Sequence, residues 1–235
     1  MAKILVLFSI LLVNACTHQP GPSLQIQTGE QLPELAAEFE TVITASDGNE
    51  NVQIQRYRWR FWRAAKRIET RNLGDNSGEV WEKSANGDIA YTQVFHDQKQ
   101  AIDYLPGDLS AIGAELDWTA LATLVNKGML SGLVADDQEN VLGHVARHYQ
   151  RNDPEKPLEI TWLEDEQIPA MIKRTEQGHT LITRMTAVYS LTQASWPYNR
   201  ATEYRHTDFA DLGDKENDPI IQSVAQKNRF RPLSH

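Results

Sequence analysis

Basic and aromatic side chains alternate strictly over residues 56–61 of the segment 56–63, whose sequence is RYRWRFWR. Successive side chains of a β-strand point to opposite faces of the sheet, so this period of two predicts a strand with one aromatic and one cationic face. The two faces carry the aromatic set Tyr57, Trp59 and Phe61 and the basic set Arg56, Arg58 and Arg60. Cationic aromatic segments also bind nucleic acid or insert into membranes. A half-buried sheet requires this alternation, however, so we expect the aromatic side chains to face a core.

Short apolar or alternating segments, separated by turn residues, surround this strand in the sequence. They predict further strands at 66–72, 79–84, 88–96 and 99–105, and then at 132–135, 141–151, 158–163, 170–176 and 179–191. Asn86-Gly87 is a typical two-residue hairpin turn between two of them. Because short turns join successive strands, the sequence predicts antiparallel meanders.

Three other segments have helical spacing. Apolar residues recur at helical intervals over 31–44, where Pro33 suits a first turn. A second helix is predicted over 117–129, with Asp117 as its N-cap. Its apolar face consists of Trp118, Leu121, Ala122, Val125 and Met129. A short third helix is predicted from Pro219 to Gln226.

Residues 1–15 have the pattern of a secretory signal, with Lys3 in a basic start and an apolar run over 4–13. As a helix, this run would be about 15 Å long, whereas the hydrocarbon core of a bilayer is roughly 30 Å thick. The run is therefore too short to span a membrane.

The end of this run, Val13-Asn14-Ala15-Cys16, resembles the lipobox of bacterial lipoproteins, although Asn14 is a less usual residue there. The resemblance implies cleavage before Cys16, a diacylglyceryl group on its sulfur and acylation of the new amine. Two or more acyl chains hold a protein stably on a membrane. Thr17 follows Cys16 in place of Asp, which by the same resemblance implies the outer membrane, with the protein facing the periplasm. An ordinary secreted protein is the alternative, but its single Cys would then have no disulfide partner.

The chain after the signal divides into a tether, one domain and a tail. Residues 16–30 are polar, with two Pro and two Gly, and predict a flexible tether. Residues 31–227 form the predicted domain, and 228–235 a loose tail. Cleavage leaves 235 − 15 = 220 residues with a charge of −10, because the precursor has −9 and Lys3 is lost. So acidic a chain is unsuited to nucleic acid or to anionic lipid surfaces as general partners.

The order of helix, meander, inserted helix and meander is similar to that of the lipoprotein-carrier family. The segment Leu158–Leu163, the turn Asp165–Gln167 and Ile168-Pro169 before a long hairpin carry the resemblance. It implies an α+β fold, mainly antiparallel: a strongly curved sheet, or incomplete barrel, with helices plugging its concave face. On such a sheet the arginine face is convex, and we expect its arginines to pair with acids such as Glu69, Glu79 and Glu82.

The same resemblance places a possible acyl-chain cavity on the concave face. Its expected lining is Tyr57, Trp59, Phe61, Trp81, Trp118, Leu121 and Val125. Two functions are open. The half-barrel binds a lipid or acyl chain, or it is filled by its own side chains and docks other envelope proteins. A mostly apolar cavity of roughly 300–1,000 Å³ would favour the first.

Other chemistry has little support in the sequence. His144 and His148 share a face of a strand about 13 Å apart, too far for one metal ion. An acidic segment with candidate ligands His206, Asp208, Asp211 and Asp214 lacks the spacing of a calcium loop, and a solvated loop is favoured. Gly128–Gly132 misplaces its serine for a nucleophile elbow. We therefore expect no metal, no cofactor and no enzymatic activity.

Overall fold

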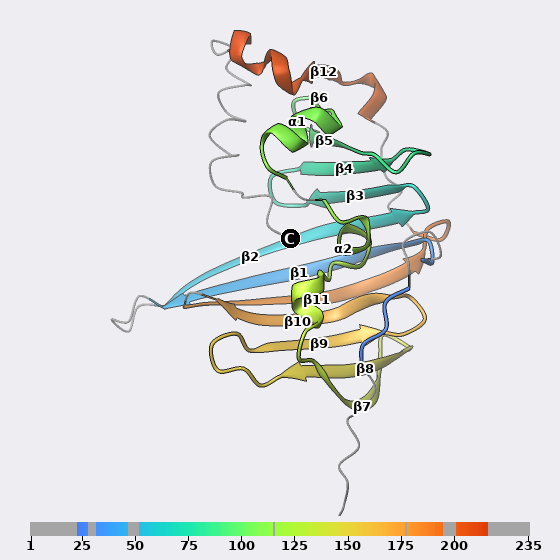
Figure 1. Ribbon diagram of the computed structural model, residues 1–235, viewed down its shortest axis with the longest axis vertical. Helices are drawn as coiled ribbons and strands as arrows, with labels where there is room; N and C mark the ends of the chain where they lie inside the picture. The colour runs from blue at the N-terminus through green and yellow to red at the C-terminus, as the bar shows by residue number, and fades with distance from the viewer. Residues whose placement is uncertain are drawn as a thin grey trace, which may run out of the picture.

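The computed structural model describes residues 23–27, 32–46, 52–114, 116–176, 178–194 and 201–215, and one strongly curved sheet dominates them (Figure 1). All neighbouring strands are antiparallel except β12, which pairs parallel with β6. The strands are β1 (Leu35–Ser46), β2 (Val52–Ala64), β3 (Arg67–Asn72), β4 (Ser77–Lys83), β5 (Ile89–Phe95), β6 (Gln100–Tyr104), β7 (Val134–Val141), β8 (His144–Arg151), β9 (Leu158–Leu163), β10 (Ile168–Glu176), β11 (His179–Ser190) and β12 (Arg205–Asp208). The predicted class, an α+β fold with a curved, mainly antiparallel sheet, is confirmed.

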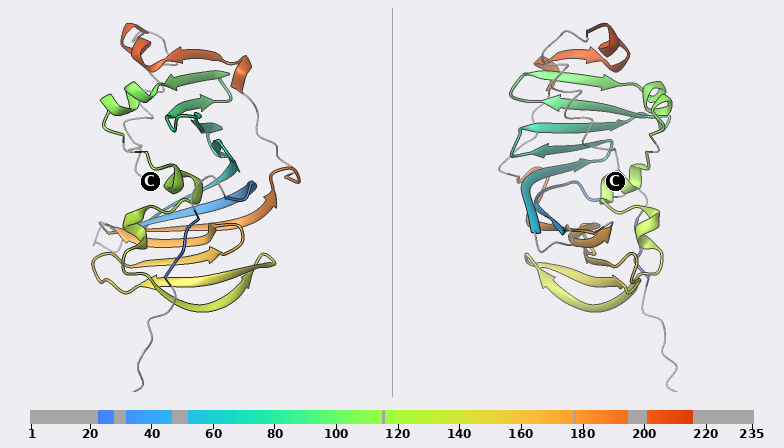
Figure 2. Two further views of the ribbon diagram at one scale, coloured as in Figure 1. Left: turned by 45° about the vertical axis from the view of Figure 1, so that its right-hand side comes forward. Right: turned by 90° about the vertical axis from the view of Figure 1, so that its left-hand side faces the viewer.

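The first strand lies at the centre of the sheet, whose order is β12-β6-β5-β4-β3-β2-β1-β11-β10-β9-β8-β7. From β1 the chain runs outward through β2–β6 to one side. The helices α1 (Pro106–Ala111), α2 (Trp118–Thr123) and α3 (Lys127–Leu130) then cross the concave face to β7 at the other edge (Figure 2). The chain returns through β8–β11 and closes against β1. Short 3₁₀ turns flank β12 at Ala201–Glu203 and Phe209–Lys215.

The predicted helix at 31–44 is wrong, because this segment forms β1. Its apolar residues have helical spacing, but the run Thr41–Thr44 is β-branched throughout and favours a strand. The face of β1 that carries Phe39 is buried, whereas the other face carries the partly buried Glu38 and Glu40 together with the apolar Ala36 and Val42. Because apolar residues stand on both faces, the alternation that would have identified the strand is obscured.

The two faces of β2 are as predicted, but the acidic partners of its arginines are not. Phe61 is fully buried, and Arg58 is largely exposed. The arginines bind acids of β1, with Glu38 accepting from Arg58 at 3.0 Å and from Arg60 at 3.1 Å. Arg56 lies 3.6 Å from Glu40.

The acids named in the prediction have other roles. Glu69 and Glu82 pair with Arg67, at 3.1 and 2.6 Å. Glu79 lies on the concave face. The error arose because the sequence placed only β3 and β4 beside β2, whereas the misassigned β1 is its other neighbour.

The predicted helix at 117–129 forms two short helices. Asp117 is the N-cap, as predicted, and its carboxylate accepts from the backbone N–H of Thr119 at 2.9 Å. Leu124 then adopts a left-handed conformation with φ of 59°, which ends α2. The Asn126 side chain accepts from the N–H of Met129 and begins α3. Helix α1, which the sequence did not predict, begins at Pro106.

The turn residues determine where the chain reverses direction in two hairpins. Asn86-Gly87 joins β4 and β5, as predicted, and Gly87 has a φ of 96°. The predicted strand 141–151 is instead divided, because Leu142 and Gly143 both adopt positive φ and turn the chain between β7 and β8. Each of the other predicted strands overlaps an observed one.

Some predicted segments fall on residues that the structure does not describe. Residues 1–22, with the signal and Cys16, the predicted helix Pro219–Gln226 and the tail 228–235 lie outside the described residues. Part of the predicted tether packs on the domain, since Leu24 is 8% exposed in a core cluster and the N–H of Gln27 donates to Gln167. In the described ranges, no helix has the length and apolar character needed to cross a bilayer.

Two core clusters fill most of the concave side. The larger one packs β1–β6 and parts of β8–β11 against α1 and α2, and it includes Phe39, Phe61, Trp81, Trp118 and Leu121. The smaller one packs β8 and β9 against the α2–α3 connection and consists of Leu24, Val125, Tyr149, Leu158, Ile160 and Trp162. The helices are thus attached to both halves of the sheet.

A buried arginine connects the segments around the larger core. Arg63, the penultimate residue of β2, is 1% exposed. Its guanidinium donates to the carbonyl oxygens of Pro33 at 2.9 Å, Ala122 at 2.8 Å and Gln167 at 2.9 Å, and also to that of Glu166. Burial lowers the pKa of Arg63 to about 9, against the nearby Glu166 carboxylate, which raises it. The side chain stays charged at neutral pH.

Replacing Arg63 with Met should destabilise the domain strongly, by about 3–5 kcal/mol, because four buried carbonyl groups lose their donor. The matched variant Arg58→Met, on the exposed face of the same strand, should cost less than about 1 kcal/mol. Thermal unfolding measures both, and Arg63→Met should lower the Tm by at least about 6 °C. Equal losses for the two variants would contradict the role of Arg63.

Candidate functional site: a cavity between the sheet and the helices

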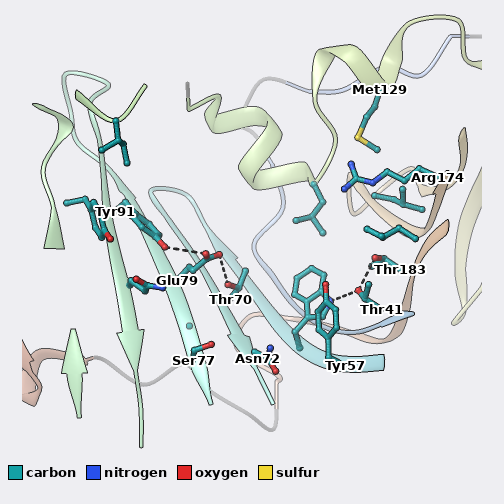
Figure 3. A pocket seen from close by; sticks show the side chains of 18 of the residues that line it. Thr41, Tyr57, Thr70, Asn72, Ser77, Glu79, Tyr91, Met129, Arg174 and Thr183 are labelled. Atoms are coloured by element: carbon teal, nitrogen blue, oxygen red, sulfur yellow. Dashed lines mark hydrogen bonds between the residues drawn. The ribbon is translucent and has the colours of Figure 1, made fainter. Parts of the chain in front are cut away.

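A cavity of about 560 Å³ lies between the concave face of the sheet and the helices (Figure 3). It lies between the two core clusters, since Trp59 and Leu124 in its wall pack against the larger and Met129 and Ile172 against the smaller. The lining is mostly apolar. It consists of Thr41, Tyr57, Trp59, Thr70, Asn72, Ser77, Gly78, Glu79, Tyr91, Gln93, Tyr104, Ile112, Leu124, Met129, Ile172, Arg174, Leu181, Thr183 and Phe209.

The wall on β2 is aromatic and rigid. The Trp59 ring stacks on Phe39, with 4.6 Å between ring centroids and 18° between planes. Its Nε1 donates to Thr41 Oγ1 at 3.0 Å, and the Thr41 and Thr183 hydroxyls are 2.9 Å apart. This chain of hydrogen bonds crosses β2, β1 and β11. It satisfies the polar atoms there and leaves the indole ring as an apolar surface.

An acid occupies the wall on β4. Glu79 accepts hydrogen bonds from Thr70 Oγ1 of β3 at 3.4 Å and from Tyr91 Oη of β5 at 3.3 Å. The register places these three residues side by side, because Thr70 pairs with Glu79, and Tyr91 lies two residues before the partner of Glu79. The carboxylate therefore has hydroxyl donors from both neighbouring strands.

A cation occupies the wall on β10. Arg174 is half-buried, and Figure 3 shows its guanidinium pointing into the cavity below Met129. The residues opposite it on β9 and β11 are Leu158 and Leu181, both apolar. Within the described ranges, its side chain makes no hydrogen bond or ion pair. Arg174 and Glu79 are the charged members of the lining.

The predicted ligand-binding residues divide between the cavity and the cores. Tyr57 and Trp59 line the cavity. The other five are buried in the clusters that border it: Phe61, Trp81, Trp118 and Leu121 in the larger core and Val125 in the smaller. Those five pack within the cores, whereas Tyr57 and Trp59 are only partly buried and reach the cavity.

Several lining residues were missed by the sequence reasoning. Ile172 and Arg174 are two residues apart on β10, so their spacing alone places them on the same face of the strand. Nothing in the sequence indicated that this face of β10 meets β2 across the cavity, because β1 was assigned to a helix. Leu124 lines the cavity only because its left-handed conformation turns it out of the helical periodicity.

The candidate metal ligands do not converge in the part of the chain that the structure describes. No group of three or more His, Cys, Asp or Glu side chains there could hold a metal ion. His206 Nδ1 lies 2.7 Å from Asp103, and its Nε2 lies 2.9 Å from the Ala201 carbonyl. Asp208 and Asp211 are exposed, and the side chain of Asp214 lies outside the description. His144 binds Glu166 at 2.5 Å rather than sharing a site with His148.

Two histidines have opposite pKa shifts. Burial, together with the positive charge of Arg71, lowers the pKa of His96 to about 4 against the opposing effect of Asp97. Its Nδ1 lies 3.0 Å from the Tyr204 hydroxyl. Partial burial lowers the pKa of His206, but the hydrogen bonds to Ala201 and Asp103 raise it more, so the net shift is upward.

No known family model matches the chain, and no curated protein is similar to it in sequence. Solved structures similar in fold include PNGF-II, at 10% identity over 77% of this chain and 34% of that one, with a TM-score of 0.37. MucB matches at 13% identity over 73% of this chain and 56% of its own, with a TM-score of 0.42. The LolA superfamily protein NE2245 from Nitrosomonas europaea matches at 8% identity over 67% and 86%, with a TM-score of 0.33.

The chain spans about a third of PNGF-II and just over half of MucB. At these identities and TM-scores the likeness assigns no ligand or partner to this chain. Its function has to be argued from its own cavity.

Titration by NMR should separate the two histidines. At pH 5.5, His206 should be protonated and His96 neutral. The unfolded chain protonates a histidine near pH 6.5, so the stability due to neutral His96 is complete above that pH and is lost as the pH falls toward 4. The variant His96→Gln should lose less stability than the wild type between pH 6.5 and 5. A His96 signal that titrates near 6.5 would contradict its burial.

Proposed function

We propose that this protein binds an apolar ligand, such as a lipid acyl chain, in the cavity between the sheet and the helices. The observation that supports the proposal is the cavity itself. Its volume of about 560 Å³ lies within the range of small-molecule sites, roughly 300–1,000 Å³, and its lining is mostly apolar.

The packing around the cavity supports this function over a self-filled half-barrel. Protein interiors are close-packed, and voids larger than a water molecule are few. Here Phe61, Trp81 and Trp162 are 0–2% exposed in well-packed cores, while the described residues leave a cavity between those cores. An apolar ligand that enters such a cavity covers apolar surface that would otherwise contact water, which favours binding. We propose binding and no catalysis.

A second function, docking of another envelope protein, is favoured by one surface feature. Val52 and Ile54, at the start of β2, are 56% and 65% exposed on one face of the strand. Exposed apolar side chains that lie together mark interaction surfaces, although these two make a small patch. The cavity is the larger feature, so ligand binding remains the first proposal.

The proposed location follows from the leader. We propose that Cys16 is lipidated and anchors the protein to the outer membrane, facing the periplasm. Replacing Cys16 with Ala should release the protein into the soluble fraction and remove the mass of the lipid. A variant that stays membrane-bound, together with a wild type that has no lipid mass, would contradict the anchor.

Filling the cavity should abolish ligand binding without unfolding the domain. Leu181 lines the cavity from β11, so Leu181→Trp would occupy part of it. Val145, which is 48% exposed on β8 and outside the cavity, provides the control variant Val145→Trp. Native mass spectrometry of protein purified from its host should detect a co-purified lipid in the wild type and the control, and little in Leu181→Trp.

If no lipid is recovered with the wild type, with Val145→Trp or with Leu181→Trp, the proposed ligand is contradicted and the docking function is favoured. Equal lipid on Leu181→Trp and the wild type would place the lipid elsewhere, for example on Cys16 alone.

A further inference from the structure

We propose that the cavity selects an amphiphile with an anionic head group, a carboxylate or phosphate, and that this head group binds Arg174. The inference rests on the proposed function and adds the chemical class of the ligand. The cavity is mostly apolar, but the guanidinium of Arg174 points into it and has no partner among the described residues.

Arg174 is half-buried in the cavity wall, so part of its side chain is removed from water. Charged side chains that are removed from water are normally paired. Lys173, the preceding residue, illustrates the rule, since its Nζ lies 2.7 Å from Glu159. Arg174 points to the other side of the sheet, where its cross-strand neighbours Leu158 and Leu181 offer no acceptor. Its unmet hydrogen-bonding capacity is therefore directed at the cavity.

Several other polar groups of the lining already have partners. Thr41 bonds Trp59 and Thr183, and Glu79 has two hydroxyl donors. Asn72 accepts from the N–H of Gly74 at 2.8 Å. A ligand that enters the cavity thus meets a mostly apolar surface and, among the described residues, one cation without a partner. A guanidinium presents its N–H groups as a planar fork that matches a carboxylate or phosphate.

Glu79, the other charged residue of the lining, sets the orientation of the ligand. Glu79 lies on the wall formed by β3–β5, and Arg174 on the wall formed by β10 (Figure 3). An anionic head group is repelled at Glu79 and attracted at Arg174, so it binds on the β10 side. The tail then lies against the aromatic wall of Tyr57 and Trp59. The net charge of −9 weakens the long-range attraction of any anion, so the head group has to be held by the close contact with Arg174.

Four probes with the same dodecyl tail test the head group: laurate, dodecyl phosphate, dodecanol and dodecylamine. Their affinities are measured by displacement of a neutral dye, N-phenyl-1-naphthylamine, from the purified full chain. We expect one or both of the anionic probes to bind at least about tenfold more tightly than dodecanol, the effect of a hydrogen bond to a charged group. Preference for laurate would indicate a fatty acid, and preference for dodecyl phosphate a phospholipid.

The variant Arg174→Gln should lose this preference while keeping the affinity for dodecanol, which shows that the cavity is intact. The control is Arg184→Gln, because Arg184 is exposed on the opposite face of β11. It should behave as the wild type does.

Failure of every probe to displace the dye, or no binding of the dye, would overturn the proposed function. Equal binding of the four probes to wild type and Arg174→Gln would overturn only the anionic head group. Tighter binding of dodecylamine, lost in Glu79→Gln, would place a cationic head group at the other wall and overturn the assignment to Arg174.

Discussion

A single buried cation holds together the parts of this fold that are far apart in the sequence. Arg63 lies near the end of β2, and its guanidinium donates to carbonyl groups of the segment before β1, the last turn of α2 and the β9–β10 turn. Helix α2 has six residues and is too short to be stable by itself. The bond to Ala122 satisfies a carbonyl at its C-terminal end and fixes it over the sheet. Leu124 follows α2 and lines the cavity, so its position depends on that attachment.

The sequence predicted those elements whose local signals agree with their surroundings. Strand β2 alternates because one face meets water, and the hairpin at Asn86-Gly87 follows from turn chemistry. Strand β1 was missed because apolar residues stand on both of its faces, one of which also carries the partly buried Glu38 and Glu40, so its apolar positions follow no strict period of two. The division of helix 117–129 was missed because Leu124 takes a left-handed conformation that leucine rarely adopts.

Only part of the candidate site could be predicted, because local sequence signals do not show which residues meet across the cavity. Large aromatic residues identify the concave face, but they do not show which of its positions stay open. Phe61 and Trp81 fill a core, while Trp59 faces the cavity. Arg174 resembled any other exposed charge in an acidic chain. Its importance depends on Leu158 and Leu181 lying opposite it, and this pairing is a property of the register, not of the local sequence.

The central position of the first strand also affects how the chain can fold. One side of β1 pairs with β2, which follows it directly, but the other side pairs with β11, so that Thr41 meets Thr183, 142 residues away. Contacts of such separation form late, because the loop between them must close first. Until β11 has been synthesised, β1 has an unpaired edge in the middle of the future sheet, and such edges promote aggregation. A chain with this topology therefore depends on being kept from association until its C-terminal half is available.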